Sequence, residues 1–430
     1  MSKYIKFCMI CFVVLFVFSG CGLKTVDQLY CLPKRSEAYS NLQTAIDEAM
    51  DGLAFSAPIY GDNRQTVQVA DLDGDGVDEY LLFAKDNSEK PLKILIFAQL
   101  ASGYVLMDTI EGYGLAFDFV EYAQTDDRPG VEIIVGRQVS DQVARAVSVY
   151  RFSSGFARTL LPSTGYSRLT TCDLDRDGQR EIFLLNYGET DNGKGLVTLY
   201  RYDNGEMQRS VDKKLSESAN NFERFTTGTL ADGTQAVFVS CEKSDKTLIT
   251  DIFRMEENQI LAVADGIAAQ QIMGYHVYPL DVDSDGVTEL SRRVLIPSVS
   301  EGSNYLLQWY SLDRNGSETI KTHTFHHYAE GWFVVVKPEW VNYMTVERTE
   351  EATTFYRLDG NRQIKLGTIR ALTDADREEQ AKKNNRIVLY KSDAVIYTAE
   401  LFSGAADLGI TEEYLRENFF PIRAELIEED

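Results

Sequence analysis

The amino-acid sequence predicts an all-β protein: a β-propeller of about seven four-stranded blades, with six or eight blades also compatible, and a short N-terminal helix. Three observations predict this fold. Acidic loops that lead directly into apolar strands start at residues 71, 173 and 281, which are 102 and 108 residues apart. A degenerate copy of the loop lies near the middle of each gap, so the underlying period is about 50 to 55 residues, as in propeller blades. About four strand-like segments fall within each period.

The acidic loops span residues 71–79 (DLDGDGVDE), 173–181 (DLDRDGQRE) and 281–289 (DVDSDGVTE), and each has carboxylates at positions 1, 3, 5 and 9. Carboxylates this close in a folded chain repel one another unless a hard cation neutralises them. The loops therefore predict calcium sites. A glycine stands at position 6 of each loop, where a sharp turn favours a residue without Cβ: Gly76, Gly178 and Gly286.

The two degenerate copies have lost most of these carboxylates. The first, residues 124–132, keeps Glu132, but Gln124 stands at position 1 and Arg128 at position 5. We expect it to have lost its ion, with the Arg128 guanidinium as the replacement cation. The second copy, residues 228–236, keeps Asp232 and Gly233 and is expected to bind nothing.

The acidic loops differ from EF-hand loops, which also begin Asp-x-Asp-x-Asp-Gly. An EF-hand needs flanking helices and a bidentate Glu at position 12, where this chain has Leu82, Leu184 and Arg292. With Glu at position 9 and a strand following at once, the loops resemble the FG-GAP repeat of the integrin-alpha type and its bacterial relative, the VCBS repeat. The resemblance covers residues 65–290 well and the last third of the chain weakly.

This resemblance implies a calcium-binding β-propeller and one set of oxygen ligands for each loop. The implied ligands of the first site are Asp71, Asp73, Asp75, Glu79 and the carbonyl of Val77. Those of the second are Asp173, Asp175, Asp177, Glu181 and the carbonyl of Gln179. Those of the third are Asp281, Asp283, Asp285, Glu289 and the carbonyl of Val287. We expect structural ions, and the alternatives are acidic turns without metal and calcium that captures a ligand.

The N-terminal segment has the layout of a secretory signal. Lys3 and Lys6 precede an apolar run over residues 7–18, and two small residues precede Cys21. This layout resembles the bacterial lipobox, although Phe18 replaces the usual leucine. We predict a lipoprotein signal peptide (1–20), a lipid-anchored tether and helix (21–56) and a propeller (57–430). A plain signal peptide with an incidental cysteine is the alternative.

A lipid on Cys21 places the protein outside the cytoplasm, anchored to a bacterial membrane, where free calcium fills sites of modest affinity. The helix is predicted over residues 36–53, where Leu42, Ile46 and Met50 recur at four-residue spacing. A second short helix is predicted over residues 411–418, before a final strand over 422–427. The net charge of −23 disfavours nucleic acid as a partner.

Other candidate chemistry is weak. His323, His326 and His327 lie close in sequence, but on a strand at most two of them share a face, so we expect surface histidines. The three tryptophans could form a platform for sugar rings, but aromatic residues on propeller strands more often pack between blades. The sequence has no nucleophile elbow and no HExxH motif.

The sequence thus favours a non-enzymatic, calcium-stabilised module on the cell surface that binds a protein or a glycan. The main alternative is a secreted glycan-active enzyme, a lyase or a hydrolase, on the same scaffold, since such enzymes scatter their catalytic residues. A third class is an assembly scaffold for envelope proteins. A deep pocket lined by carboxylates or histidine would favour the enzyme, and a flatter face would favour the binding module.

Overall fold

The computed structural model describes residues 37–140, 145–187, 193–270, 276–297 and 304–422. Within these residues the chain is nearly all antiparallel β structure, which confirms the predicted class. The predicted signal peptide, Cys21 and most of the predicted final strand lie outside the described residues, and the domain boundaries stay predictions. In the described part of the chain, no helix is both long and apolar enough to span a membrane.

The described strands form six antiparallel sheets, numbered 1 to 6 here in chain order. Sheet 1 contains β1 (Ala54–Phe55), β2 (Val67–Ala70), β3 (Glu79–Lys85), β4 (Leu92–Leu100) and β5 (Gly103–Gly112). Sheet 2 contains β6 (Ala116–Ala123), β7 (Glu132–Gln138), β8 (Arg145–Ser153) and β9 (Phe156–Tyr166). Sheet 3 contains β10 (Arg168–Cys172), β11 (Glu181–Asn186), β12 (Lys194–Asp203), β13 (Glu206–Arg209) and β14 (Lys213–Ser218).

Three further sheets follow in the chain. Sheet 4 contains β15 (Phe222–Thr229), β16 (Gln235–Glu242), β17 (Thr247–Glu256) and β18 (Gln259–Gln270). Sheet 5 contains β19 (Leu290–Ile296), β20 (Asn304–Leu312), β21 (Glu318–His327), β22 (Trp332–Val336) and β28 (Phe419–Pro421). Sheet 6 contains β23 (Met344–Arg348), β24 (Thr353–Asp359), β25 (Arg362–Leu372), β26 (Ile387–Lys391) and β27 (Ile396–Leu401). Most neighbours in a sheet are consecutive in the chain, whereas β28 returns to pair with β22.

The described helices are few and short apart from the first. Helix α3 (Glu37–Ala49) confirms the predicted N-terminal helix, and it buries Leu42 and Ile46 against sheet 1. Helix α6 (Glu412–Asn418) confirms the second predicted helix, with the Thr411 hydroxyl accepting a hydrogen bond from the N–H of Tyr414 as its N-cap. The others are α4 (Arg377–Gln380), α5 (Ser403–Ala406), η1 (Ala219–Asn221), η2 (Tyr328–Glu330), η3 (Pro338–Trp340) and η4 (Lys383–Asn385).

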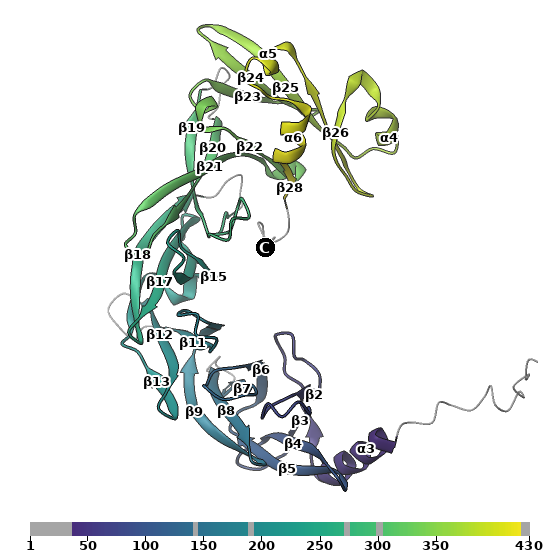
Figure 1. Ribbon diagram of the computed structural model, residues 1–430, viewed down its shortest axis with the longest axis vertical. Helices are drawn as coiled ribbons and strands as arrows, with labels where there is room; N and C mark the ends of the chain where they lie inside the picture. The colour runs from purple at the N-terminus through teal and green to yellow at the C-terminus, as the bar shows by residue number, and fades with distance from the viewer. Residues whose placement is uncertain (1–36, 141–144, 188–192, 271–275, 298–303, 423–430) are drawn as a thin grey trace, which may run out of the picture.

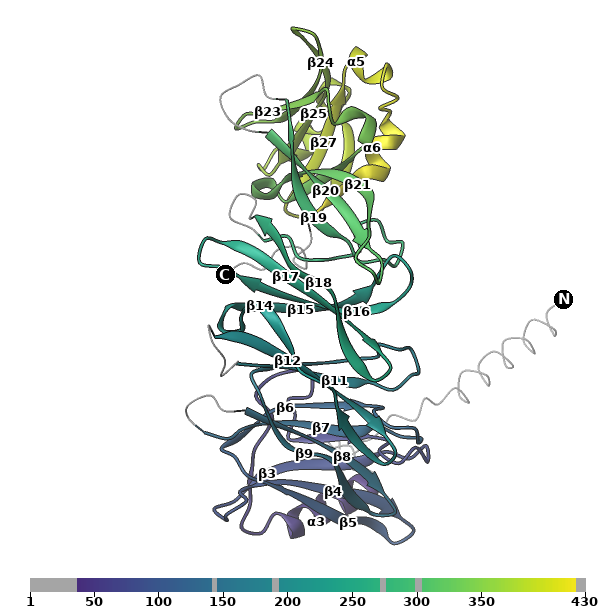
Figure 2. The same cartoon turned by 90° about the vertical axis from the view of Figure 1, so that its left-hand side faces the viewer.

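The sheets follow one another along an open arc (Figure 1), and the side view shows them stacked as a column (Figure 2). The early strands of a sheet, such as β6 and β15, lie toward the concave side, and the last strands, such as β9 and β18, lie toward the convex side. Sheets 1 and 6 lie at opposite ends of the arc, so the described residues do not reproduce the predicted closed ring of about seven blades. The last three strands, β26, β27 and β28, extend sheets 5 and 6 and form no further sheet within the described residues.

Each neighbouring pair of sheets shares a hydrophobic core. One cluster joins sheets 1 and 2 and the next joins sheets 2 and 3, and the same holds along the chain to sheets 5 and 6. The second strand of a sheet is therefore covered on both faces, and strands such as β7 and β16 are buried along nearly their whole length. This burial explains why their sequences are continuous apolar runs rather than alternating patterns.

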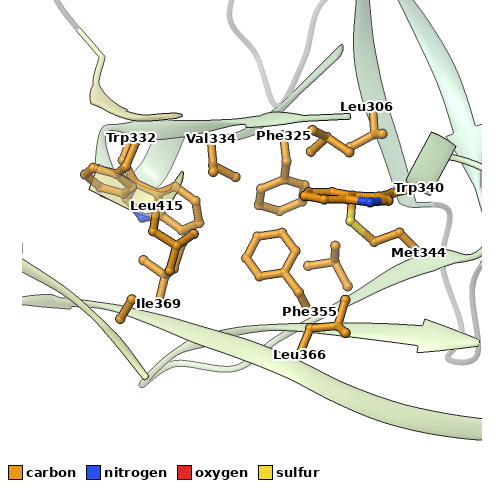
Figure 3. Close-up of a cluster of buried hydrophobic side chains, with 14 of the residues drawn as sticks. Leu306, Phe325, Trp332, Val334, Trp340, Met344, Phe355, Leu366, Ile369 and Leu415 are labelled. Atoms are coloured by element: carbon orange, nitrogen blue, oxygen red, sulfur yellow. The ribbon is translucent and has the colours of Figure 1, made fainter. Parts of the chain in front are cut away.

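The core between sheets 5 and 6 is rich in aromatic residues (Figure 3). Trp309, Trp332 and Trp340 are all buried, so they pack in cores, as the sequence favoured, and form no exposed platform. The expectation of surface histidines was wrong, because His323, His326 and His327 are only 5–8% exposed. Apolar contacts explain this burial: the His326 ring is stacked at 4.9 Å from the Phe333 ring, and burial lowers the pKa of His326 to about 3.

Two cysteines lie in another of these cores. Cys172 and Cys241 are both buried in the cluster between sheets 3 and 4, and both are free thiols. Burial raises the pKa of Cys241 to about 12, so this thiol is protonated and unreactive at neutral pH. These cysteines therefore act as small apolar core residues.

Phe325 tests the core between sheets 5 and 6. It is fully buried, and its ring centroid lies 5.1 Å from that of Phe355 in sheet 6. Phe325→Ala should lower the free energy of unfolding by about 3–5 kcal/mol because it leaves a cavity. Urea unfolding measures this loss. The control, Phe156→Ala, removes a ring that is 63% exposed and should change stability by no more than about 0.5 kcal/mol. Equal effects of the two substitutions would contradict the assignment of this core.

Candidate metal centres

The acidic loops occupy equivalent places in three of the described sheets. Residues 71–79 connect β2 to β3 in sheet 1, and residues 173–181 connect β10 to β11 in sheet 3. Residues 281–289 lead into β19 in sheet 5, where an isolated bridge pairs Leu280 with Glu289. The two degenerate copies hold the same place in sheets 2 and 4. Each repeat of about 50 to 55 residues inferred from the sequence therefore corresponds to one sheet.

Each loop gathers carboxylate oxygens at one point. Single ligand atoms from each member of a group lie within 4.8 Å of one another. The three groups are Asp71, Asp73 and Glu79; Asp173, Asp175 and Asp177; and Asp281, Asp283 and Asp285. Oxygen donors of this charge and spacing suit a hard divalent cation. Nine of the predicted carboxylate ligands are thus brought together, whereas Asp75, Glu181 and Glu289 lie outside the tight groups.

The first loop is folded by its own side chains. The Asp71 carboxylate accepts hydrogen bonds from the N–H groups of Gly74 and Gly76, at 2.8 and 3.0 Å. Asp75 accepts from the N–H of Val77 at 2.8 Å. The other acidic loops repeat this pattern, as in the bond from the Gly286 N–H to Asp281 at 2.8 Å. Hydrogen bonds within the loop therefore support its shape.

The glycine at position 6 confirms the predicted turn. Its φ is +85° in the first and third loops and +88° in the second, a left-handed conformation that favours glycine. The carbonyl oxygens of Val77, Gln179 and Val287, which follow this turn, stay predicted ligands. Their N–H groups are used inside the loops as donors to aspartate.

The glutamate at position 9 is buried where the strand after the loop begins. Glu79, Glu181 and Glu289 are 4%, 0% and 0% exposed, and one oxygen of each accepts the N–H of the residue at position 2, at 2.8 to 3.0 Å. The Oε1 oxygens of Glu181 and Glu289 are both buried without a hydrogen-bond partner in the described structure, and that of Glu181 lies 3.6 Å from the Nε of Arg201. A buried carboxylate oxygen without a partner is costly unless a cation compensates it. The residues at this position therefore fit a metal ion.

Burial also changes the acidity of these glutamates. Burial is the main cause, and the neighbouring aspartates add to it, so that the pKa of Glu79 and of Glu289 rises to about 7 and that of Glu181 to about 8. A cation beside each carboxylate would favour its ionised form and lower these pKa values. The pKa shifts thus agree with the unpartnered oxygen of Glu289.

In sheet 2, an arginine neutralises the degenerate loop, but it is Arg151 from β8 and not the predicted Arg128. The buried Arg151 guanidinium forms ion pairs with Asp126 and with Glu132, the latter at 3.0 Å. Arg128 contributes backbone groups instead, with its N–H donating to Asp126 at 2.9 Å. The prediction failed because strand pairing brings Arg151 beside the loop from 19 residues beyond Glu132.

The copy in sheet 4 has no acidic group at position 9. Its Asp232 forms an ion pair with Arg314, which lies after β20 in sheet 5. Burial acts to raise the pKa of Asp232, but the hydrogen bonds from Arg314 and Thr234 outweigh it and lower the pKa to about 2. The ion pair of Asp232 with Arg314 therefore links sheets 4 and 5.

Neighbouring loops also touch one another. The N–H of Arg180 in the loop of sheet 3 donates to the carbonyl of Gln124 in the loop of sheet 2, at 2.7 Å. The N–H of Thr288 in the loop of sheet 5 donates to the carbonyl of Thr229 in sheet 4, at 2.8 Å. An ion that fixes one loop therefore also supports the next sheet.

No family model and no curated protein matches the sequence. Among solved structures, the chain is similar to an exo-β-1,3-galactanase from Phanerochaete chrysosporium, with 12% identity, a TM-score of 0.30, and coverage of 86% of this chain and 91% of that one. It is also similar to a rhamnogalacturonan lyase from Bacillus licheniformis, with 14% identity, a TM-score of 0.24, and coverage of 72% and 48%. A GH43 β-xylosidase/α-arabinofuranosidase from a compost microbial metagenome gives 9% identity, a TM-score of 0.22, and coverage of 66% and 97%.

These comparisons correct the function predicted from the sequence. The main expectation was a non-enzymatic module that binds a protein or a glycan. The solved structures named above are glycan-cleaving enzymes, which favours the alternative of a glycan-active enzyme. TM-scores this low transfer no substrate and no catalytic residue to this chain, so any such site must be argued from its own side chains.

The buried ion pairs of Arg151 predict that removing its side chain will destabilise the protein strongly. Arg151→Ala leaves Asp126 and Glu132 buried without a cation and should lower the free energy of unfolding by about 3–5 kcal/mol. The control is Arg180→Ala, which breaks a half-exposed ion pair with Glu121 and should cost no more than about 1 kcal/mol. Chemical denaturation of both variants measures the difference. A loss below about 1 kcal/mol for Arg151→Ala would contradict the role of this arginine.

Proposed function

We propose that this chain binds calcium through its acidic loops and that the bound ions hold together the two chain segments that flank each loop. The observation that carries the proposal is the combination of converging carboxylates with the buried, unpartnered oxygen of Glu289. The donors are carboxylate oxygens, which hard cations prefer. The resemblance to FG-GAP and VCBS repeats, on the residues given above, agrees with this proposal.

Calcium would act on stability through the loops of sheets 1 and 5. In both, the ion would lie between carboxylates at the end of one strand and a glutamate at the start of the next, Glu79 or Glu289. Because these glutamates are buried, the ion would replace the solvation that the carboxylates lose on folding. The ions are therefore proposed as structural parts of the fold.

Chelation should destabilise the protein. A ligand that binds only the folded state at a hundredfold its Kd adds about 2.7 kcal/mol per site. Removing calcium with a chelator should therefore lower the Tm, and Asp71→Asn should reduce the calcium-dependent part of the Tm. Asp232→Ala serves as the control, because Asp232 is an acidic loop residue paired with Arg314, and it should leave the calcium dependence unchanged. A Tm that does not respond to chelator would remove the proposal.

A second candidate function, a glycan-active enzyme, is favoured by a polar cavity between sheets 3 and 4. The cavity has a volume of about 450 Å³ and is lined by Glu217, Asn221, Glu242, Lys243, Ser244 and Asp245. Two glutamates thus come to one cavity from β14 and β16, which are in different sheets. Paired carboxylates, one ionised and one protonated, are the groups that hydrolyse glycosidic bonds.

Glu242 is the candidate ionised group of this cavity. It accepts a hydrogen bond from Lys246 at 2.5 Å and contacts the ring of His276. Burial acts to raise the pKa of Glu242, but its bonds to Lys246 and His276 outweigh burial and lower the pKa. A carboxylate kept ionised beside a second carboxyl group suits a base or a nucleophile.

Activity measurements test this candidate. Purified protein would be incubated with β-1,3-galactan, rhamnogalacturonan and arabinoxylan, and cleavage would be followed by new reducing ends and by absorbance of unsaturated products. Glu242→Gln should lower any activity by about 10²–10⁴-fold, because it removes the charge and the basic oxygen. Glu256→Gln, at the end of β17, is the control and should retain activity. Equal activity of both variants would exclude Glu242 as a catalytic residue.

A further inference from the structure

In each of sheets 1 to 5, the strand after the loop pairs with the next strand in the chain, and the register of that pairing sets one residue opposite position 9. In sheet 3 the pairing of Ile182 with Tyr200 places Arg201 opposite Glu181. In the other sheets, the strand pairing likewise places one residue opposite position 9. These residues are Ala98 in sheet 1, Arg151 in sheet 2, Arg254 in sheet 4 and Ser311 in sheet 5. This position therefore carries either a small side chain or an arginine.

Sheet 2 demonstrates what an arginine does at this position. The Arg151 guanidinium binds the two remaining carboxylates of its loop, Asp126 and Glu132, and it also donates to the carbonyl of Pro129 at 3.1 Å. The loop keeps its shape with a protein cation in place of a metal ion. The residue opposite position 9 thus reaches the centre of the loop.

Sheet 3 combines a complete acidic loop with an arginine at the same position. The Nη2 of Arg201 lies 2.9 Å from Asp175 and 2.7 Å from Asp177, and its Nε lies 3.6 Å from Glu181. On its other side, Nη1 donates to the side chain of Asn258 at 2.9 Å, in the hairpin of sheet 4. The carboxylates of the loop on one side and Asn258 on the other therefore fix the position of the guanidinium.

We infer that Arg201 is the resident cation of the second loop, so that calcium occupies the first and third loops and is excluded from the second. This inference rests on the proposed calcium binding. A guanidinium and a divalent ion on the same carboxylates repel each other strongly at these separations. An arginine held by planar, multiple contacts is also a good replacement for a cation. The predicted second site therefore holds an internal ion pair.

The first and third loops have no arginine opposite position 9. Ala98 and Ser311 at the equivalent position carry no charge. Lys321 from β21 does pair with Asp285 in the third loop, but it pairs with that one carboxylate, whereas Arg201 pairs with two carboxylates and lies 3.6 Å from a third. A lysine on a flexible stem at the rim can move into solvent when a metal binds. These two loops therefore remain available to calcium.

Calcium stoichiometry tests the inference. The full mature chain would be stripped with chelator and titrated with calcium alone by isothermal titration calorimetry, with metal content checked by atomic emission. The wild type should bind two ions, and Arg201→Ala should bind three, because it opens a complete set of carboxylates. Arg254→Ala is the matched control: the same position in sheet 4 faces a loop without these carboxylates, so two ions are expected.

A second variant keeps the inference testable if Arg201→Ala does not fold. Asp173→Asn in the wild-type background should leave the count at two, whereas Asp71→Asn should reduce it to one. Three ions in the wild type, with one lost in Asp173→Asn, would overturn the inference and leave calcium binding intact. Two ions in a folded Arg201→Ala would also overturn it. Absence of any calcium binding would instead refute the proposed function.

Discussion

In sheets 1, 2, 3 and 5, the structure depends on a buried carboxylate where the strand after the loop begins. Glu79, Glu132, Glu181 and Glu289 all hold this place, all are nearly or fully buried, and each accepts the N–H of the residue at position 2 or its neighbour. Burying this charge without a cation is costly. In sheet 2 the Arg151 guanidinium supplies the cation, and for the acidic loops we propose Arg201 or calcium in the same role.

Much of the fold follows from the sequence. The acidic loops and their spacing identified the repeating unit, and even the two degenerate copies lie between the first and second strands of their sheets. Helix α3 and helix α6 were also found, because their apolar spacing and N-cap signals are local. Such patterns depend on residues that are close in the sequence, so they can be recognised without knowing which sheets pack together.

The failures involve contacts between segments that are distant in the sequence. The closed ring was predicted because repeats of blade length suggest one, whereas the pairing of β26, β27 and β28 with strands of sheets 5 and 6 depends on distant contacts. Arg151 was missed because its neighbour in space is set by strand register, which no short motif encodes. The histidines of β21 were expected at the surface because a polar ring stacked in an aromatic core has no sequence signature.

The return of β28 to β22 has a consequence for how the molecule is made. Sheets 1 to 4 are each completed before the next begins, so a growing chain can add them one at a time from its N-terminus. Sheet 5 gains its outermost strand only after sheet 6 has been synthesised. The last two sheets must therefore assemble together, and the final third of the chain is one cooperative unit at the end of an otherwise stepwise array.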